Sequence, residues 1–155
     1  MIRNFHMNRR SAFLSLAAMM FFPAKTWAAW PLVTVHKDPT CGCCGGWIAH
    51  LELRGFQTKT IETKEINRVK ARLGVPFDLQ ACHTAEVGGY LIEGHVPASA
   101  IEKLLTEHPK AKGLAVPGMP SGSPGMTGDY EDYDVILFGP NERRVFGKFK
   151  GENQI

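Results

Sequence analysis

Short apolar strands alternate with amphipathic helices along the chain after residue 30. Apolar and β-branched residues at 32–36 indicate a first strand, and residues 56–62 alternate enough to indicate a second. A third strand is predicted over residues 87–92, where two glycines interrupt it. Residues 134–138 and 143–149, which are separated by Gly-Pro-Asn-Glu, predict a β-hairpin near the C-terminus.

Three helices are predicted between these strands. The first has Cys44, Trp47 and Leu51 at helical spacing. The second covers residues 65–73, which place apolar side chains on one face and end at a glycine. The third begins at Pro97, because proline fits the first turn of a helix. Each helix therefore has one apolar face that can pack on a sheet.

The order of these elements predicts an α/β fold with a central mixed sheet, flanking helices and a C-terminal β-hairpin. Residues 113–129 are rich in glycine and proline and are predicted to form a loop. A cluster of cysteines stands at the junction between the first strand and the first helix. A thioredoxin-like fold carries its reactive site at this junction, so we expect the fold to be thioredoxin-like.

The N-terminal segment has the order of a secretory signal peptide. Arg9 and Arg10 precede an apolar run at residues 12–22, and a short site of small residues follows. The run is shorter than the ~20 residues that a membrane-spanning helix needs. We therefore expect residues 1–28 to be removed and residues 29–155 to form the exported domain. The arginine pair leaves the Sec and twin-arginine export routes both open.

Removing this segment changes the charge of the protein. The whole chain has 18 basic and 15 acidic residues, a net charge of +3. Residues 1–28 hold four of the basic residues and no acidic residue, so the exported domain has 14 against 15. No basic stripe remains that would indicate nucleic-acid binding, and no second apolar run would insert into a membrane. The signal indicates a periplasmic location, which is an oxidising compartment.

Three cysteines crowd the start of the first predicted helix. Cys41, Cys43 and Cys44 lie within four residues, where the positive end of the helix dipole stabilises thiolates. Adjacent thiolates repel one another unless a cation lies among them, and soft thiolates select Cu(I) or zinc. The pattern favours a metal site. Two alternatives stay open: a redox pair of Cys41 and Cys44, and a disulfide from either of them to Cys82.

Further sulfur and nitrogen donors occur at the ends of the predicted elements and in the loop. They are Cys82 and His83 in a polar loop, His95 before the third helix, His36 at the end of the first strand, and Met119 and Met126. The two methionines lie in a Gly/Pro-rich segment with no apolar period, so core packing explains them poorly. Thioether sulfur is a soft ligand suited to Cu(I).

The chain resembles the CopG-like family of bacterial periplasmic copper-resistance and metal-binding domains. Several separated motifs in the same order carry the resemblance: His36-Lys37, Cys41-Gly42-Cys43-Cys44, Cys82-His83-Thr84-Ala85, Gly94-His95-Val96-Pro97-Ala98, residues 113–120 and residues 122–126. The resemblance implies a thioredoxin-like fold and copper held as a multinuclear, cysteine-bridged cluster. It also implies a role in copper tolerance through Cu(I)/Cu(II) interconversion.

The resemblance also implies a ligand set and partners. It places the four cysteines first, Cys41, Cys43, Cys44 and Cys82, then Met119, Met126 and His83, and lastly His95 and His36. It favours copper over zinc, and it implies copper ions and copper-handling periplasmic proteins, such as an efflux system, as partners. It leaves open whether the protein is an enzyme. The competing functions are a periplasmic thiol-disulfide oxidoreductase that uses Cys41 and Cys44, and a passive copper carrier.

Overall fold

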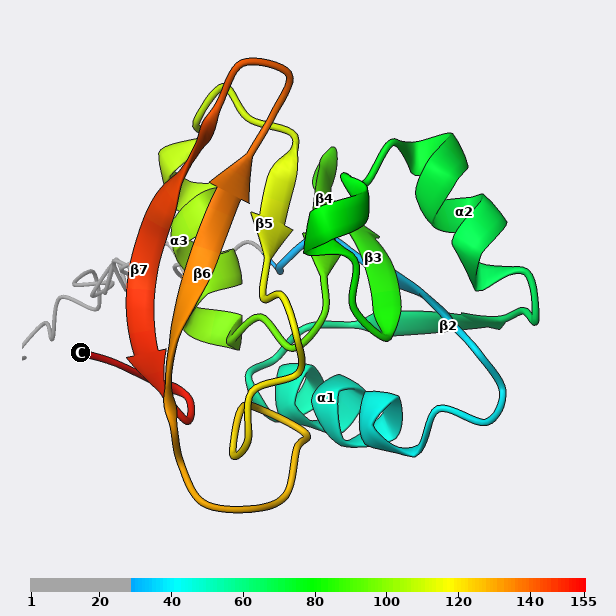
Figure 1. Ribbon diagram of the computed structural model, residues 1–155, viewed down its shortest axis with the longest axis horizontal. Helices are drawn as coiled ribbons and strands as arrows, with labels where there is room; N and C mark the ends of the chain where they lie inside the picture. Colours follow the sequence, from blue (N-terminus) through cyan, green and yellow to red (C-terminus); the bar gives the residue numbers. More distant parts are fainter. Residues whose placement is uncertain (1–28) are drawn as a thin grey trace, which may run out of the picture.

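The computed structural model describes residues 29–155, so the predicted signal peptide lies outside the described residues. These residues form an eight-stranded sheet and three α-helices (Figure 1). The strands are β1 (Val33–Lys37), β2 (Thr58–Glu62), β3 (His83–Val87), β4 (Tyr90–Glu93), β5 (Gly113–Ala115), β6 (Asp132–Phe138), β7 (Arg143–Lys150) and β8 (Asn153–Gln154). The helices are α1 (Gly42–Leu53), α2 (Ile66–Leu73) and α3 (Ala98–Glu107), with a 3-10 turn η1 (Phe77–Leu79).

The sheet is mixed, as the sequence predicts. Its strand order is β2-β1-β3-β4-β5-β6-β7-β8. The pairs β1–β2 and β4–β5 are parallel, and the other neighbouring pairs are antiparallel. The α/β class and the mixed sheet are therefore confirmed, whereas the thioredoxin-like assignment stays a prediction.

The two faces of the sheet are covered by different helices. Alternate residues of each strand point to opposite faces. On one face, Val33 and Val35 of β1 join a core with Trp47 of α1 and Leu104 of α3. On the other face, a smaller core forms between β4, β5 and β6 and the segment that follows α2. Consequently α1 and α3 share one face of the sheet, and α2 and η1 lie against the other.

The predicted third strand is wrong, because residues 87–92 belong to two strands. Gly88 and Gly89 have φ of +55° and +86°, and they form the two-residue turn between β3 and β4. Two glycines with positive φ match the turn that the right-handed twist of a hairpin favours. The extra strand begins at His83, so the Cys82-His83 pair lies at a strand end and not in a polar loop.

The remaining predictions at the level of elements are close to the structure. The C-terminal hairpin is confirmed by the antiparallel pairing of β6 and β7, and the three helices lie where the apolar spacing places them. The prediction of a loop over residues 113–129 is wrong at its first three residues, which form β5 between β4 and β6. Across residues 29–155, no helix combines the length and apolar character needed to cross a membrane.

Candidate metal centre

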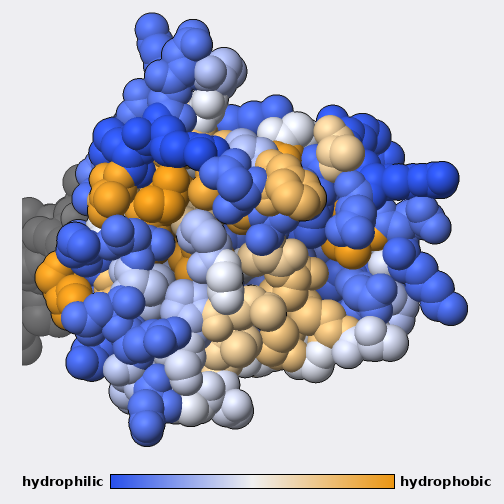
Figure 2. Space-filling model, in the orientation of Figure 1, coloured by the Kyte–Doolittle hydropathy of each residue, from blue (hydrophilic) through white to orange (hydrophobic). Residues whose placement is uncertain are grey.

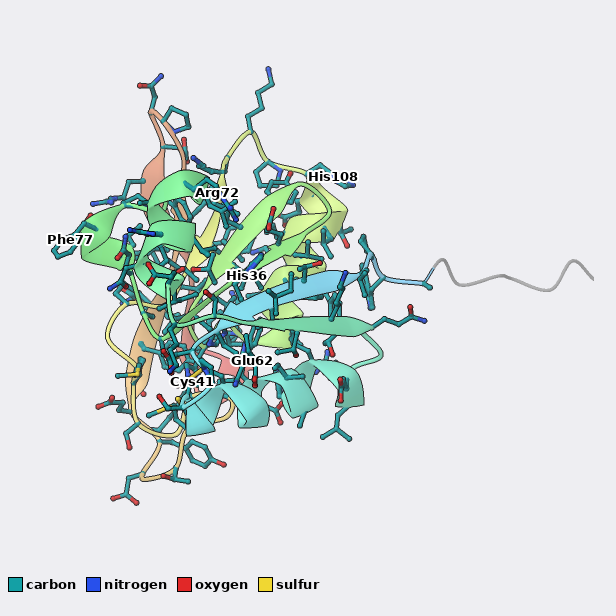
Figure 3. The ribbon with its side chains drawn as sticks, turned by 90° about the vertical axis from the view of Figure 1, so that its right-hand side faces the viewer. His36, Cys41, Glu62, Arg72, Phe77 and His108 are labelled. Atoms are coloured by element: carbon teal, nitrogen blue, oxygen red, sulfur yellow. A yellow bond between two sulfur atoms is a disulfide. The ribbon has the colours of Figure 1, made fainter. Side chains whose placement is uncertain are left out.

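The cysteine cluster lies where α1 begins, after the strand β1 and a short turn. Cys41 is the N-cap residue of α1, and its side chain makes no capping hydrogen bond. Asp38 forms the turn before it by accepting hydrogen bonds from the backbone N–H and the hydroxyl of Thr40. Figure 3 shows Cys41 at the start of the helix. The helix therefore directs its unsatisfied N–H groups and the positive end of its dipole toward the sulfurs.

The four cysteine sulfurs are gathered in one place. Cys41 and Cys44 form a disulfide, with their Cα atoms 5.6 Å apart. Cys43 and Cys82 are free thiols. The Cys43 sulfur lies 3.7 Å from that of Cys41 and 4.0 Å from that of Cys82. All four Sγ atoms lie within 4.8 Å of one another. The alternative disulfide to Cys82 is not formed in the structure.

Two histidine nitrogens lie close to the Cys82 sulfur. His83 Nδ1 lies 3.2 Å and His95 Nε2 lies 3.1 Å from the Cys82 sulfur. The three donors, one sulfur and two ring nitrogens, lie within 4.8 Å of one another. Cys82 therefore belongs to two donor groups at once, one of four cysteines and one of a cysteine with two histidines.

The histidine rings are held by contacts that leave nitrogen lone pairs for a ligand. His95 Nδ1 lies 2.7 Å from the carbonyl oxygen of Pro124, so this nitrogen carries the proton and donates it. His95 Nε2 then has a free lone pair that faces Cys82, which is the usual arrangement of a metal-ligating histidine. The His83 ring packs on the Trp47 ring at a centroid distance of 4.3 Å.

His83 also has a buried atom that the protein leaves unsatisfied. Among the residues that the structure describes, His83 Nε2 is the buried side-chain nitrogen without a hydrogen-bond partner. Buried polar atoms normally have a partner, so an orphan requires an explanation such as a bound ion. Sulfur and imidazole donors together suit copper or zinc. The donor set therefore fits a soft or borderline metal ion.

Burial sets the protonation of these groups in the metal-free protein. Burial and the neighbouring Cys43 raise the pKa of the Cys82 thiol to about 12, so it is protonated at neutral pH. Burial lowers the pKa of His83 and of His95, which are therefore neutral. Neutral imidazole is the form that ligates metals. A metal ion would displace the Cys82 proton and find the histidines already in the ligand form.

The structure does not bring His36 into this cluster. His36 faces the side of the sheet opposite α1, since Val35 beside it belongs to the α1 core. Its Nε2 lies 3.0 Å from a carboxylate oxygen of Glu86, and the ring is buried. Figure 3 shows His36 on β1 and Cys41 at the start of α1.

The segment with the two methionines lies against α1. A Cβ atom added at Gly46 would come 2.9 Å from the Cα atom of Gly125, so the loop and the helix approach closely there. Met126 is half-buried and lines a cavity of about 340 Å³ beside α1. Met119 is 46% exposed and has a φ of +57°. The segment thus contacts the helix that carries the cysteines, and Met126 lines a cavity together with residues of that helix.

Sequence reasoning missed the contacts that orient the donors. The carbonyl of Pro124 and the ring of Trp47 have no signature in a single sequence, because a backbone carbonyl is present at every position and a tryptophan among apolar residues indicates core. Lys70, Thr84 and Glu93 were also missed. All three are buried and form hydrogen bonds with one another. A lysine in an amphipathic helix and a lone glutamate in a strand resemble ordinary surface residues.

Comparisons with known proteins show which family the chain belongs to. Residues 79–126 match a family model described as "Protein of unknown function, DUF411". Two solved structures of the copper resistance protein CopG, form 1 and form 2, are 42% and 41% identical to this chain, with TM-scores of 0.72 and 0.73. In both cases the match covers 77% of this chain and 98% of CopG. No curated protein matches the chain. At this identity and coverage, the chain belongs to the family of the copper resistance protein CopG.

Proposed function

We propose that the protein binds copper in the periplasm and serves copper resistance. The ligands would be Cys43, Cys82, His83 and His95, together with Cys41 and Cys44 once their disulfide is reduced. The observation that carries this proposal is the convergence of four cysteine sulfurs and two histidine nitrogens around Cys82. The 42% identity to a copper resistance protein favours copper over zinc for this donor set.

The shared position of Cys82 supports a site for more than one copper ion. A thiolate sulfur can bridge two metal ions, and the Cys82 sulfur borders both donor groups. One ion would bind among the cysteines, and a second would bind toward His83 and His95. Bridging thiolates would also reduce the number of sulfurs that each ion requires. This arrangement supports the proposal of a multinuclear, cysteine-bridged site.

The mixed donor set suits both oxidation states of copper. Thiolate and thioether sulfur prefer Cu(I), and imidazole also accepts Cu(II). Met126, on the segment that packs against α1, would supply a thioether at the edge of the site. Met119 lies earlier in the same loop. Interconversion of Cu(I) and Cu(II) would exchange one electron with an external partner. The thioredoxin-like assignment is part of this proposal, supported by a Cys-x-x-Cys sequence at the start of the helix that follows β1.

The test is a competition assay with a colorimetric Cu(I) chelator on reduced protein. The double variant Cys43→Ser/Cys82→Ser should lose affinity by about 100-fold or more, which is about 3 kcal/mol. His108→Asn serves as the control, because His108 is exposed at the end of α3. Equal affinity of the double variant and the wild-type protein would overturn the proposal.

A thiol-disulfide oxidoreductase is the second candidate, because Cys41 and Cys44 form a disulfide at a helix start. This disulfide can be reduced by a substrate dithiol, which becomes a disulfide, and the reduced pair can then attack a substrate disulfide. Insulin reduction that survives Cys43→Ser and Cys82→Ser would favour this enzyme. A copper carrier differs from both, since it would transfer Cu(I) to an acceptor without changing its oxidation state.

A further inference from the structure

A buried ion pair lies directly behind the donors, on the opposite face of the sheet from α1. Lys70 of α2 is 1% exposed and Glu93 of β4 is fully buried. The Lys70 ammonium lies 2.5 Å from one carboxylate oxygen of Glu93. Figure 1 shows α2, the helix that includes Lys70, in a separate part of the molecule from α1. Taking two charges out of water is costly, and a pair of this kind is weak evidence for a role in stability alone.

Hydrogen bonds tie this pair to the chain on either side of the donors. Thr84 accepts a hydrogen bond from Lys70 at 2.8 Å and donates one to the second carboxylate oxygen of Glu93 at 2.5 Å. The first carboxylate oxygen of Glu93 also accepts the backbone N–H of Ala81 at 2.6 Å. We refer to Lys70, Thr84 and Glu93 as the buried triad. Both oxygens of the Glu93 carboxylate accept hydrogen bonds, from Lys70 and Ala81 on one oxygen and from Thr84 on the other.

The three residues joined by these hydrogen bonds, Ala81, Thr84 and Glu93, each lie one or two residues from a donor residue in the chain. Ala81 precedes Cys82, Thr84 follows His83, and Glu93 lies two residues before His95. Between Glu93 and His95, Gly94 has a φ of +72°, and a Cβ there would lie 2.8 Å from the carbonyl oxygen of Val116. The backbone at this turn therefore has little freedom. Fixing Ala81, Thr84 and Glu93 therefore fixes two chain segments, residues 81–84 with Cys82 and His83, and residues 93–95 with His95.

We propose that the buried triad is a positioning device for the metal site, which sets the distances from the Cys82 sulfur to the two histidine rings. This inference rests on the copper-binding function proposed above. The side-chain hydrogen bonds of the triad within residues 29–155 go to one another and to the Ala81 backbone and not to a donor atom, so the positioning acts through the backbone. Partners behind metal ligands typically change metal affinity by about 10–100-fold when they are removed. We infer an effect of that size here.

Substitution of Thr84 tests the inference with a matched pair of variants. Thr84→Val keeps the shape of the side chain and removes the hydroxyl that joins Lys70 to Glu93. Thr84→Ser keeps the hydroxyl. Reduced Thr84→Val protein should bind Cu(I) about 10-fold or more weakly than wild type in chelator competition, and Thr84→Ser should restore most of the affinity.

A second variant and a second readout separate positioning from loss of stability. Lys70→Met/Glu93→Gln removes both charges together and keeps an acceptor for the Ala81 N–H. In metal-free protein with the disulfide intact, the alkylation rate of Cys82 relative to Cys43 should change in this variant and in Thr84→Val. The Cys43 rate is an internal standard, because general destabilisation would expose both thiols. Leu137→Ala, a core substitution on β6, is the stability control and should leave the ratio unchanged.

The outcomes distinguish this inference from the proposed function. If wild-type protein binds Cu(I) and both triad variants bind it equally well, the positioning role is wrong and the copper function stands. If Leu137→Ala at matched stability loses as much affinity as Thr84→Val, the role of the triad is structural only, and the inference is also overturned. If wild-type protein binds no copper, the proposed function fails, and the positioning role fails with it.

Discussion

At the scale of single residues, Cys82 is the centre of the site. Its sulfur lies within 4.0 Å of the Cys43 sulfur and within 3.2 Å of a nitrogen in each of two histidines. The chemical types of the ligands could be predicted from the sequence, because cysteine and histidine are rare and distinctive. Their pairing could not, since it depends on how β3 and β4 bring His83 and His95 to one sulfur.

Cys82→Ser should therefore lower the number of bound copper ions more than Cys43→Ser does. Cys82 borders both donor groups, whereas Cys43 belongs to the cysteine group alone. We expect Cys82→Ser to lower the number of Cu(I) ions bound per chain and Cys43→Ser to lower mainly the affinity. The measurement is a Cu(I) titration of each reduced variant. A larger loss of bound copper in Cys43→Ser would contradict the shared role of Cys82.

The buried histidines predict how stability depends on pH. Burial lowers the pKa of His50, His83 and His95 below 6.5 in the folded protein. The unfolded chain then binds more protons as the pH falls below about 6.5, so the folded state loses stability on acidification. Metal-free protein should have a lower urea midpoint at pH 5.5 than at pH 7.5.

His50→Gln gives this prediction a control outside the metal site. His50 Nε2 accepts the backbone N–H of Ala98, and a glutamine can accept the same hydrogen bond without titrating. The difference between the two urea midpoints should be smaller in this variant. A midpoint that stays constant or rises on acidification would contradict the assignment of neutral, buried histidines.

At the scale of elements, the site depends on one loop packed against one helix. The start of α1 presents the cysteines, and the segment after β5 supplies the Pro124 carbonyl that orients His95. The helices and the hairpin could be predicted from apolar spacing and turn residues. The split of residues 87–92 into two strands could not, because a Gly-Gly pair also occurs within a strand as a bulge.

Gly46→Ala tests the contact between the loop and the helix. Its Cβ atom would lie 2.9 Å from Gly125 Cα, so the loop must move away from α1. We expect a loss of about 1–3 kcal/mol in the free energy of unfolding, together with weaker Cu(I) binding because Pro124 moves with the loop.

Gly45→Ala is the matched control in the same helix. A Cβ atom at Gly45 meets no atom within 4 Å. This variant should be more stable by about 0.5–1 kcal/mol, since alanine restricts the unfolded chain, and should bind Cu(I) like the wild type. Urea unfolding and chelator competition measure both quantities. Equal behaviour of the two alanine variants would show that the close approach has no role.

At the scale of the whole molecule, the oxidation state of the cysteines limits how much metal the protein can hold. The disulfide of Cys41 and Cys44 takes two of the four sulfurs out of the ligand set and leaves two free thiols. Within residues 29–155, the groups of three or more side chains that could hold a metal ion are the two that share Cys82. The face of the molecule in Figure 2 is mostly hydrophilic, with separate hydrophobic areas. Copper capacity should therefore follow the thiol count.

Reduction should raise the copper capacity of the purified protein. With the disulfide intact, thiol titration should give two thiols per chain, and after reduction four. The reduced form should bind more Cu(I) than the oxidised form, because two further thiolates become available. An identical copper capacity of both forms would mean that Cys41 and Cys44 are not ligands.

The number of copper ions bound per chain tests the central claim most directly. Protein purified from cells that express the full chain is reduced without oxygen, loaded with Cu(I) and separated from excess metal, and its copper is measured by elemental analysis. A shared site around Cys82 predicts more than one copper ion per chain. A value of one or fewer would contradict the proposed cysteine-bridged site.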